Sequence, residues 1–570
     1  MNRITPTLAL LLLSTQGVAA EPSVTMMPLA DGTRLKTMVI LPDGPGPFPA
    51  IVLRTPYGLP TSPSGPVQLD DDDAAEADIL ATWAPVLERG FAVVQQNTRG
   101  RGGSEGLDLL FQSDRADGAA LADWVVSQPW SDGTFRLTGD SADGFAGYLM
   151  AAEQPEGLTG AFFQVSCANL QELGVVRRTG GLQMEVLAPW IIQQAEESGS
   201  QNQQSWADRG VDLEAAAASG EALLGGLFGG SVEALMQRPL AALEPVAALQ
   251  PAWKSFITEE GYAARADYFD AAADLAVPIT HVGLWQDTFL DCTLDAFLRA
   301  GGQQSLIVMN GTHYDIDDPA TWQAAGLQEA FLNWLDDVPA APVRFAVENA
   351  PDVTPIESST WPPKDAVPQR LFLTADGLSS DGAGAADALG TIVTDIAAAI
   401  PTEGGRNLVI EAGTGMSDLP QDGAGQIVRL AAPLTADTLL AGPVSLEVTL
   451  TSDAMDADIV ARLVAVDATG KPRQILENLL RARYREGREA PAPLTPGKEV
   501  TARIELGHTA HFLRAGEQLG LILQGSNLPR WDMATGGDID PALATTAQRI
   551  TTAIGAARLD FLTLPRPIAN

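Results

Sequence analysis

Apolar runs of strand length alternate with helical patterns over the first 170 residues of the chain. Val24–Leu41 alternates apolar and polar positions around a turn at Asp31-Gly32, which predicts a β-hairpin. Strands that alternate with helices predict a mostly parallel sheet covered by helices. The further expected strands are Phe48–Thr55, Phe91–Gln96 and Gly160–Ser166, and the expected helices are Ala77–Arg89 and Ala116–Ser127.

The pattern changes twice further along the chain. From Leu170 to Ala273, helical segments rich in Ala and Gln predict an insertion that covers the sheet. The sheet is expected to resume at Ile279–Leu284 and Leu306–Met309, each followed by a helix. From about residue 339, short β-type runs separated by Gly, Pro and Asp predict a β-sandwich. These runs are Val343–Val347, Gln369–Leu373, Val444–Leu450, Asp458–Ala465, Val500–Glu505 and Gln518–Leu523.

Residues 1–20 have the pattern of a secretory signal peptide. Arg3 precedes the apolar run Leu8–Leu13, and Val18-Ala19-Ala20 supplies small residues for cleavage. The apolar run is too short to span a bilayer. We therefore expect a periplasmic or secreted protein without a membrane anchor.

Composition limits the class of partner and the number of domains. The 570 residues are too many for one hydrophobic core. A formal net charge of -37 repels nucleic acid and anionic membrane surfaces, so neither is an expected partner. The two cysteines, Cys167 and Cys292, are too few for a disulfide framework. One bridge between them and two buried thiols are both compatible with the sequence.

The segment Leu137–Gly147 reads L-T-G-D-S-A-D-G-F-A-G and predicts a strand, a tight turn and a helix. This context exposes a serine on a strained turn, as in a nucleophile elbow. Gly139 and Gly144 leave room for the strand and the helix to approach closely. We predict that Ser141 is a nucleophile; the alternative is a loop serine near a helix N-terminus.

A serine nucleophile needs a histidine base, and the chain has four histidines. His281 lies inside an expected strand, and His508 and His511 lie in the β-rich part of the chain. His313 follows the strand Leu306–Met309 in a loop, which is where a hydrolase of this topology presents its base. We therefore predict that His313 is the base.

The orienting acid is expected at the end of the preceding strand. Asp287 has that position, although it could also be the N-cap of the next helix. Asp291 and Asp295 are rivals, but each lies further into that helix. The order Ser141, Asp287, His313 is the order found in α/β-hydrolases.

One segment matches the nucleophile motif in letters only. Gly102-Gly103-Ser104-Glu105-Gly106 has the pattern G-x-S-x-G, but no apolar helix follows it. We therefore interpret this segment as a loop and not as the nucleophile turn.

Acyl transfer also needs two donors for the oxyanion. The backbone N–H of Ala142 has one suitable position, directly after the nucleophile. The second donor is expected from the loop after Phe48–Thr55, where Tyr57 offers a phenol. The alternative for Tyr57 is an aromatic ring packed at a proline turn.

Several motifs occur together in this chain: Leu53-Arg54-Thr55-Pro56-Tyr57, residues 99–106, Gln128-Pro129-Trp130-Ser131-Asp132-Gly133, Gly139-Asp140-Ser141, Trp285-Gln286-Asp287-Thr288-Phe289, Gly311-Thr312-His313 and Leu480-Arg481-Ala482-Arg483-Tyr484-Arg485. The combination resembles the cocaine esterase / X-Pro dipeptidyl-peptidase family of serine hydrolases. The resemblance implies an α/β-hydrolase domain at 21–169 and 274–338, a helical cap at 170–273 and a C-terminal jelly-roll domain at 339–570. It also implies that Tyr57 donates its hydroxyl to the oxyanion and that Phe289 lies near the acyl pocket.

Two departures from the family pattern concern the substrate. The family usually has Tyr where this chain has Ala142, and Asp143 adds a charge beside the turn. Asp143 either holds a substrate cation or caps the helix, and capping is favoured. Family members selective for α-amino acyl groups carry carboxylates where this chain has Phe289 and Leu290, which argues against that specificity. Trp285 is a further candidate for contact with substrate.

We therefore predict an exported serine hydrolase that cleaves small carboxylic esters or amides through an acyl-enzyme, without a metal or organic cofactor. An X-Pro dipeptidyl-peptidase is the first alternative. A catalytically idle protein that binds carbohydrate or another ligand is the second.

Overall fold

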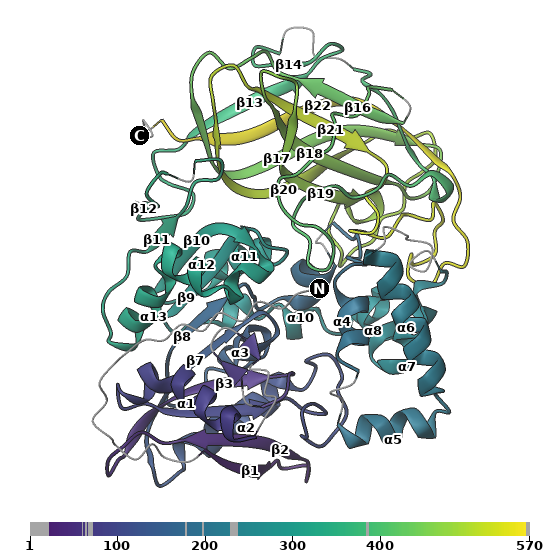
Figure 1. Cartoon of the computed structure of the whole chain (residues 1–570). Coiled ribbons are helices and arrows are strands. Elements are labelled where there is room, and N and C mark those ends of the chain that lie inside the picture. Colours follow the sequence, from purple (N-terminus) through teal and green to yellow (C-terminus); the bar gives the residue numbers. More distant parts are fainter. Residues whose placement is uncertain are drawn as a thin grey trace.

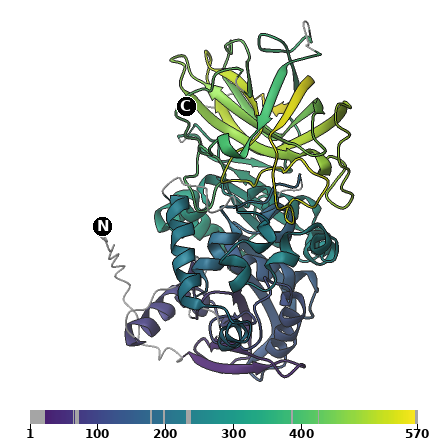
Figure 2. The same ribbon diagram turned by 90° about the vertical axis from the view of Figure 1, so that its right-hand side faces the viewer.

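The structure is a computed structural model that describes residues 22–565, except 60, 63–64, 67–71, 177–178, 196–198, 229–236, 351, 383–386 and 424. The predicted signal peptide at 1–20 lies outside the described residues. Figure 1 shows a mixed sheet with its helices in one half of the molecule, a group of helices beside it, and antiparallel strands in the other half. Figure 2 shows the same division from the side. The predicted fold class, an α/β domain followed by an all-β domain, is confirmed.

The first sheet has the strand order β1-β2-β6-β3-β7-β8-β9-β10-β11-β12. All pairings between β6 and β11 are parallel, and only the edge pairings β1–β2, β2–β6 and β11–β12 are antiparallel. The mostly parallel sheet and the N-terminal hairpin are therefore as predicted. The strands are β1 (Ser23–Pro28), β2 (Arg34–Ile40), β3 (Phe48–Thr55), β6 (Ala92–Asn97), β7 (Ser131–Asp140), β8 (Leu158–Gln164), β9 (Ile279–Gln286), β10 (Gln304–Thr312), β11 (Val343–Phe345) and β12 (Ile356–Ser358).

Helices cover both faces of this sheet because successive strand residues point to opposite faces. Val52 and Val94 pack into the core beneath α2 and α3, whereas Ile51 and Val93 pack beneath α1 and α13. The elements around the sheet are α1 (Asp72–Leu87), α2 (Asp114–Val126), α3 (Ser141–Ala152), α11 (Leu290–Arg299), η5 (His313–Asp317), α12 (Pro319–Ala325) and α13 (Leu327–Leu335), with the short pair β4 (Thr61–Ser62) and β5 (Gly65–Pro66) before α1.

The insertion after β8 is helical, as predicted, and lies beside the sheet (Figure 1). Within the described ranges, no helix is both long enough and apolar enough to cross a membrane. The insertion consists of η1 (Leu170–Val175), α4 (Leu187–Gln193), α5 (Ser200–Asp208), α6 (Leu213–Phe228), η3 (Leu240–Ala242), α7 (Val246–Leu249), α8 (Trp253–Ile257), α9 (Glu259–Ala263), α10 (Ala266–Phe269) and η4 (Ala271–Asp274).

The C-terminal half, called the β-domain below, forms two antiparallel sheets with a common apolar core. One prediction here is wrong: Val343–Val347 does not belong to this sandwich, because β11 pairs with β10 and extends the first sheet beyond the expected boundary at 339. One sheet contains β13 (Val367–Leu373), β14 (Leu378–Ser379), β15 (Gly390–Thr394), β17 (Thr438–Ser452), β20 (Val500–Leu513) and β22 (Ile550–Thr563). The other contains β16 (Gln426–Leu430), β18 (Asp458–Val466), β19 (Pro472–Arg481) and β21 (Gln518–Gln524); η6 (Ile396–Ala398) and η7 (Ala482–Tyr484) are short turns.

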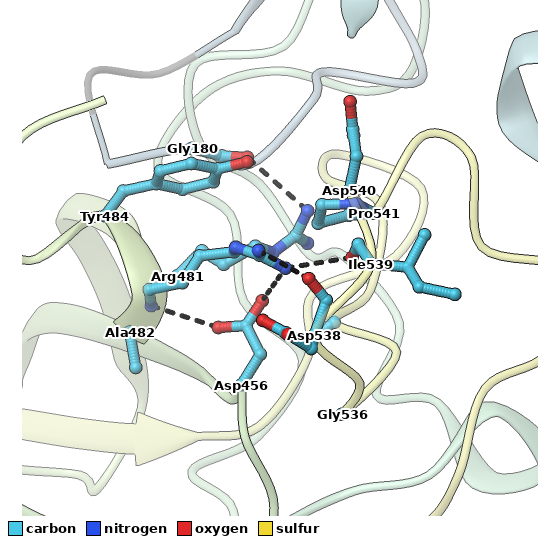
Figure 3. A network of polar contacts seen from close by, with 12 residues as sticks. Gly180, Asp456, Arg481, Ala482, Tyr484, Gly536, Asp538, Ile539, Asp540 and Pro541 are labelled. Atoms are coloured by element: carbon cyan, nitrogen blue, oxygen red, sulfur yellow. Dashed lines mark hydrogen bonds and ion pairs between the residues drawn. The ribbon is translucent and has the colours of Figure 1, made fainter. Parts of the chain in front are cut away.

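A buried ion-pair network lies where the β-domain meets the helical cap (Figure 3). Arg481, whose side chain is almost fully buried, donates to the Asp458 carboxylate at 2.9 and 3.1 Å, and to the carboxylate and the backbone carbonyl of Asp532, both at 3.0 Å. The backbone N–H of Arg481 donates to the carbonyl of Thr179 in the cap segment. One arginine thus joins the carboxylate of Asp458 in β18, the carboxylate of Asp532 in the segment between β21 and β22, and the cap.

Candidate active site

Ser141 stands on a strained turn between β7 and α3. Its φ is 45°, in the left-handed region that residues with a side chain rarely adopt. A Cβ at Gly139 would lie 2.8 Å from the carbonyl carbon of Asp143, and a Cβ at Gly144 would lie 2.5 Å from the Cβ of Ser166. The two glycines therefore permit the close approach that the sequence predicted. The Ser166 hydroxyl donates to the Ser141 carbonyl at 2.6 Å and fixes the turn.

His313 lies between Ser141 and Asp287. Its Nδ1 is 2.7 Å from Asp287 Oδ1, and its Nε2 is 3.0 Å from Ser141 Oγ. A carboxylate only accepts hydrogen bonds, so Nδ1 carries the proton and Nε2 is free to accept the serine hydroxyl. The structure thus brings together three side chains that are separated by up to 172 positions in the chain.

The ends of two neighbouring strands position this histidine and this carboxylate. Asp287 directly follows β9 and is fully buried; the N-cap of α11 is Phe289, so Asp287 does not have the capping role considered as its alternative. His313 opens η5 after an irregular end of β10, where Asp315 Oδ2 accepts from the N–H and the hydroxyl of Thr312.

Charges around His313 act on its pKa in opposite directions. Burial by itself would lower the pKa, but the charge and hydrogen bond of Asp287, together with the charges of Asp140 and Asp317, raise it above its ordinary value. Burial also raises the pKa of Asp140 to about 7, and the charge of Asp317 acts in the same direction. The site therefore favours the charged imidazolium.

The other three histidines occupy packed positions away from this triad. His281 contacts the Tyr148 hydroxyl and Gln304, and burial lowers its pKa to about 4. His508 accepts from the Trp361 indole, and burial lowers its pKa to about 4 as well. His511 lies beside Glu348. Among the described residues, the histidine that hydrogen-bonds to Ser141 is His313.

An apolar cavity of about 40 Å³ opens beside Ser141. Aromatic rings form much of its wall: Phe145 and Phe289 meet edge to face at 5.0 Å, and Phe111 stacks on Trp190 at 6.1 Å. Sequence reasoning found only Phe289 among these rings. The lining residues are Phe111, Ser141, Ala142, Phe145, Leu170, Val175, Val186, Leu187, Trp190, Phe289 and Leu408.

Two predicted substrate contacts do not reach this cavity. Trp285 is fully buried in the core behind α11, where its indole donates to the Ala346 carbonyl. Asp143 is 1% exposed and lies beside Thr55 and Tyr57, not on the cavity wall. Burial raises the pKa of Asp143 well above its ordinary value. Both predictions are corrected, because each side chain faces the protein interior.

Tyr57 follows the strand next to β7, and Ala142 directly follows Ser141. The register that pairs Val52 with Leu137 places Thr55 level with Asp140, so Tyr57 follows just beyond the same sheet edge. The Tyr57 oxygen accepts from Trp190 Nε1 at 3.2 Å, and Trp190 lines the cavity. Ala142 is in the first turn of α3, where backbone N–H groups lack partners within the helix.

Cys167 and Cys292 form a disulfide with a Cα–Cα distance of 5.3 Å. This resolves the alternatives that the sequence left open. The bridge joins the segment after β8 to α11, the helix that follows Asp287.

Ser104, the serine of the G-x-S-x-G letters, is buried away from the triad. Its hydroxyl donates to the Asn97 carbonyl and accepts from the N–H of Lys36, both at 2.9 Å. The segment is a loop, as predicted, and these hydrogen bonds give Ser104 a structural role within it.

Comparison with protein families identifies the family of this chain. The model of the X-Pro dipeptidyl-peptidase (S15 family) matches residues 31–315, half of the chain. The chain belongs to this family. The model of the X-Pro dipeptidyl-peptidase C-terminal non-catalytic domain matches residues 336–561.

Individual relatives include enzymes with different substrates in their names. The chain is 24% identical to cocaine esterase from Rhodococcus sp. (strain MB1 Bresler) over 562 residues, which cover 90% of this chain and 92% of the relative. A solved α-amino acid ester hydrolase superposes with a TM-score of 0.71 at 18% identity and covers 99% of this chain and 100% of its own. An aminopeptidase from a marine sediment Thaumarchaeota archaeon gives 0.70 at 17% identity, covering 98% and 99%. The chain is therefore a serine hydrolase, while the two solved structures show the fold alone.

Proposed function

We propose that this hydrolase cleaves carboxylic esters through an acyl-enzyme formed on Ser141. The position of His313, within hydrogen-bonding distance of both Ser141 and Asp287, carries this proposal. His313 Nε2 takes the hydroxyl proton as Ser141 Oγ bonds to the carbonyl carbon, and then gives it to the leaving oxygen. A water that loses its proton to His313 releases the acid in the second half of the reaction.

Tyr57 and the N–H of Ala142 are the proposed oxyanion donors. Burial, together with the nearby charges of Asp143 and Asp140, raises the pKa of Tyr57, so its phenol keeps its proton at the pH where His313 is neutral. The phenol can therefore donate a hydrogen bond when negative charge develops on the carbonyl oxygen.

Labelling with a fluorophosphonate tests the nucleophile directly. We expect one covalent adduct per chain, mapped to Ser141 by peptide mass spectrometry, and none in Ser141→Ala. Ser104→Ala is the matched control and is expected to label like the parent protein. An adduct on another residue would contradict the assignment of Ser141 as the nucleophile, and no adduct at all would favour an idle binding protein.

The size of the cavity predicts a preference for short acyl groups. About 40 Å³ admits only a few water-sized groups, because one water needs roughly 10–15 Å³ of such space. None of the described residues that line the cavity has a charged side chain. The acyl group is therefore expected to be apolar. Among p-nitrophenyl esters, we expect kcat/KM to be highest for acyl chains of about two to four carbons and roughly tenfold lower for octanoyl.

Leu408, which reaches the cavity from the β-domain, tests this size limit. Leu408→Ala removes three carbons from the wall and is expected to move the preferred acyl chain about one or two carbons longer. Leu419→Ala is the control, since Leu419 is a partly buried leucine of the same region that does not line the cavity. An unchanged chain-length profile in Leu408→Ala would show that acyl groups bind elsewhere.

The raised pKa of His313 predicts the pH dependence. His313 must be neutral to accept the proton, so kcat/KM is expected to rise with pH and to level off above a midpoint that exceeds the ordinary histidine value of about 6.5. Asp317→Asn removes a charge that raises this pKa and is expected to move the midpoint to lower pH by roughly half a unit. Asp318→Asn, a substitution that keeps the helix cap, is expected to leave the midpoint unchanged.

The release of X-Pro dipeptides from peptides is a second candidate function, because the family is named for this activity. A peptidase of that kind must bind a free amino terminus, for which a carboxylate is the usual partner. The described residues that line the cavity include no carboxylate. We therefore expect p-nitrophenyl acetate to be a far better substrate than Gly-Pro p-nitroanilide, and the reverse order would establish the peptidase.

We also propose that the protein is exported. The signal pattern at residues 1–20 and the disulfide between Cys167 and Cys292 both support this, since disulfides persist in oxidising compartments. Intact mass of the periplasmic or secreted form is expected to show a mature chain that begins near Glu21.

A further inference from the structure

The loop at 99–106, whose serine is not the nucleophile, contributes a buried arginine to the neighbourhood of Tyr57. Arg101 is only 3% exposed. Its Nε donates to the carbonyl of Pro56 at 3.1 Å, so it holds the residue immediately before Tyr57. A buried guanidinium in this position is costly unless its donors are used, which indicates that its contacts are specific.

The two Nη atoms of Arg101 contact the helical cap, and Nη1 also lies 3.6 Å from Asp108 Oδ2. Nη1 donates to the Gln194 carbonyl at 2.9 Å, and Nη2 donates to the Gln194 side chain at 3.1 Å. Gln194 is the C-cap of α4, the helix that carries Trp190. The guanidinium carbon also lies 5.5 Å from the centre of the Trp190 ring, within range of a cation–π contact. Arg101 thus holds both the residue before Tyr57 and the helix that contacts the Tyr57 hydroxyl.

The hydrogen bond between Trp190 and Tyr57 determines whether the Tyr57 hydroxyl can donate its own proton to another acceptor. An indole N–H only donates, so the Tyr57 oxygen must be the acceptor in this 3.2 Å bond. A phenol has a single proton, and this bond does not use it. The proton is therefore available for a further acceptor on another side of the oxygen, provided that Trp190 stays in place.

We propose that Arg101 is a positioning residue for Tyr57, acting through Pro56 on one side and Trp190 on the other so that the phenol proton is directed to the oxyanion. This inference rests on the proposed function, in which Tyr57 is an oxyanion donor. It assigns a role to the 99–106 motif, which otherwise only resembles a nucleophile turn. It also means that the cap, through Trp190, both lines the cavity and helps to orient the Tyr57 hydroxyl.

A double-mutant cycle tests this role. One oxyanion donor contributes roughly 10²–10³ in kcat, so Tyr57→Phe is expected to lower kcat by that factor on p-nitrophenyl acetate. Arg101→Met is expected to lower kcat about 10–100-fold with KM within about threefold, because the lost interaction is made in the transition state. The double variant is expected to be no slower than Tyr57→Phe alone.

Two further variants make the test specific. Trp190→Phe keeps an aromatic ring but lacks the N–H donor; it is expected to lower kcat in the parent and to have little further effect in Tyr57→Phe. If melting temperatures show that Arg101→Met does not fold, the kcat of Trp190→Phe tests the inference in its place. Arg99→Met is the control from the same loop, since Arg99 pairs with Asp31 and Asp117, and its kcat is expected to stay within about threefold of the parent.

The outcomes separate this inference from the proposed function. If the losses from Arg101→Met and Tyr57→Phe multiply in the double variant, Arg101 does not act through Tyr57 and the inference is wrong. Wild-type kcat in Arg101→Met would overturn it as well. If Tyr57→Phe alone leaves kcat unchanged, the oxyanion role of Tyr57 fails and the inference fails with it. Failure of the triad would instead be seen as fluorophosphonate labelling that does not depend on Ser141.

Discussion

Asp287→Asn is expected to lower kcat by roughly 10⁴-fold on short-chain p-nitrophenyl esters. The Asp287 carboxylate accepts the Nδ1 proton of His313 at 2.7 Å and so leaves Nε2 free to accept from Ser141. An asparagine can present its NH₂ group to Nδ1 instead. The imidazole then carries its proton on Nε2 and cannot accept the serine proton. KM is expected to change little, because the loss is in the chemical step.

The same variant is expected to shift the pH dependence. The charge and hydrogen bond of Asp287 raise the pKa of His313, so their loss lowers it. The residual activity of Asp287→Asn should therefore reach its acid midpoint at a lower pH than the parent. Steady-state rates between about pH 5 and 9, which span the ordinary histidine pKa, measure both effects.

Asp295→Asn is the matched control for Asp287→Asn. Asp295 lies in α11, the helix that follows Asp287, and pairs with Arg299 at 3.1 Å. A partly exposed pair of this kind contributes at most about 1 kcal/mol, so kcat is expected to stay within about twofold of the parent. If Asp287→Asn retains more than a tenth of the parental kcat, the acid has been assigned to the wrong residue.

Arg481→Met is expected to lower the free energy of unfolding by about 3–5 kcal/mol. The substitution keeps much of the side-chain volume but leaves the carboxylates of Asp458 and Asp532 buried without their main partner. Removing one member of a buried ion pair costs more than the pair itself contributes, because the remaining charge is not solvated. Urea unfolding followed by tryptophan fluorescence measures the change.

Arg370→Met provides the comparison within the same β-domain. Arg370 also binds an aspartate, Asp560, at 2.6 Å, but half of its side chain is exposed to solvent. Solvent stabilises both partners after the substitution, so the expected loss is at most about 1 kcal/mol. Equal losses for the two variants would show that burial does not determine the contribution of Arg481.

The pattern of apolar positions predicted most of the secondary structure. Apolar residues recur with the period of the strand or helix face that is buried. Phe48–Thr55 was predicted and is observed with the same bounds, since a continuous apolar run of this length is typical of a strand covered on both faces. Strands with mixed polarity were missed: β19 and β22 are not among the predicted runs. Such strands are paired mainly by backbone hydrogen bonds, which any side chain permits.

The triad was predicted from position along the chain. Ser141, Asp287 and His313 each follow an expected strand of a parallel sheet, and the ends of parallel strands meet at one edge. With only four histidines in the chain, elimination left one candidate. Trp285 and Asp143 could not be excluded in this way, because proximity in sequence does not tell whether a side chain points to the cavity or to the core.

The sequence by itself determined the class of most elements, the mostly parallel sheet with a serine, a carboxylate and a histidine at the ends of its strands, and the family. Each of these depends on local patterns, which the order of residues contains directly. Only the tertiary structure decided which sheet receives β11, that Cys167 bonds to Cys292, and that Trp190 and Leu408 complete the cavity. These depend on contacts between segments far apart in the chain, for which a single sequence carries no pairing signal.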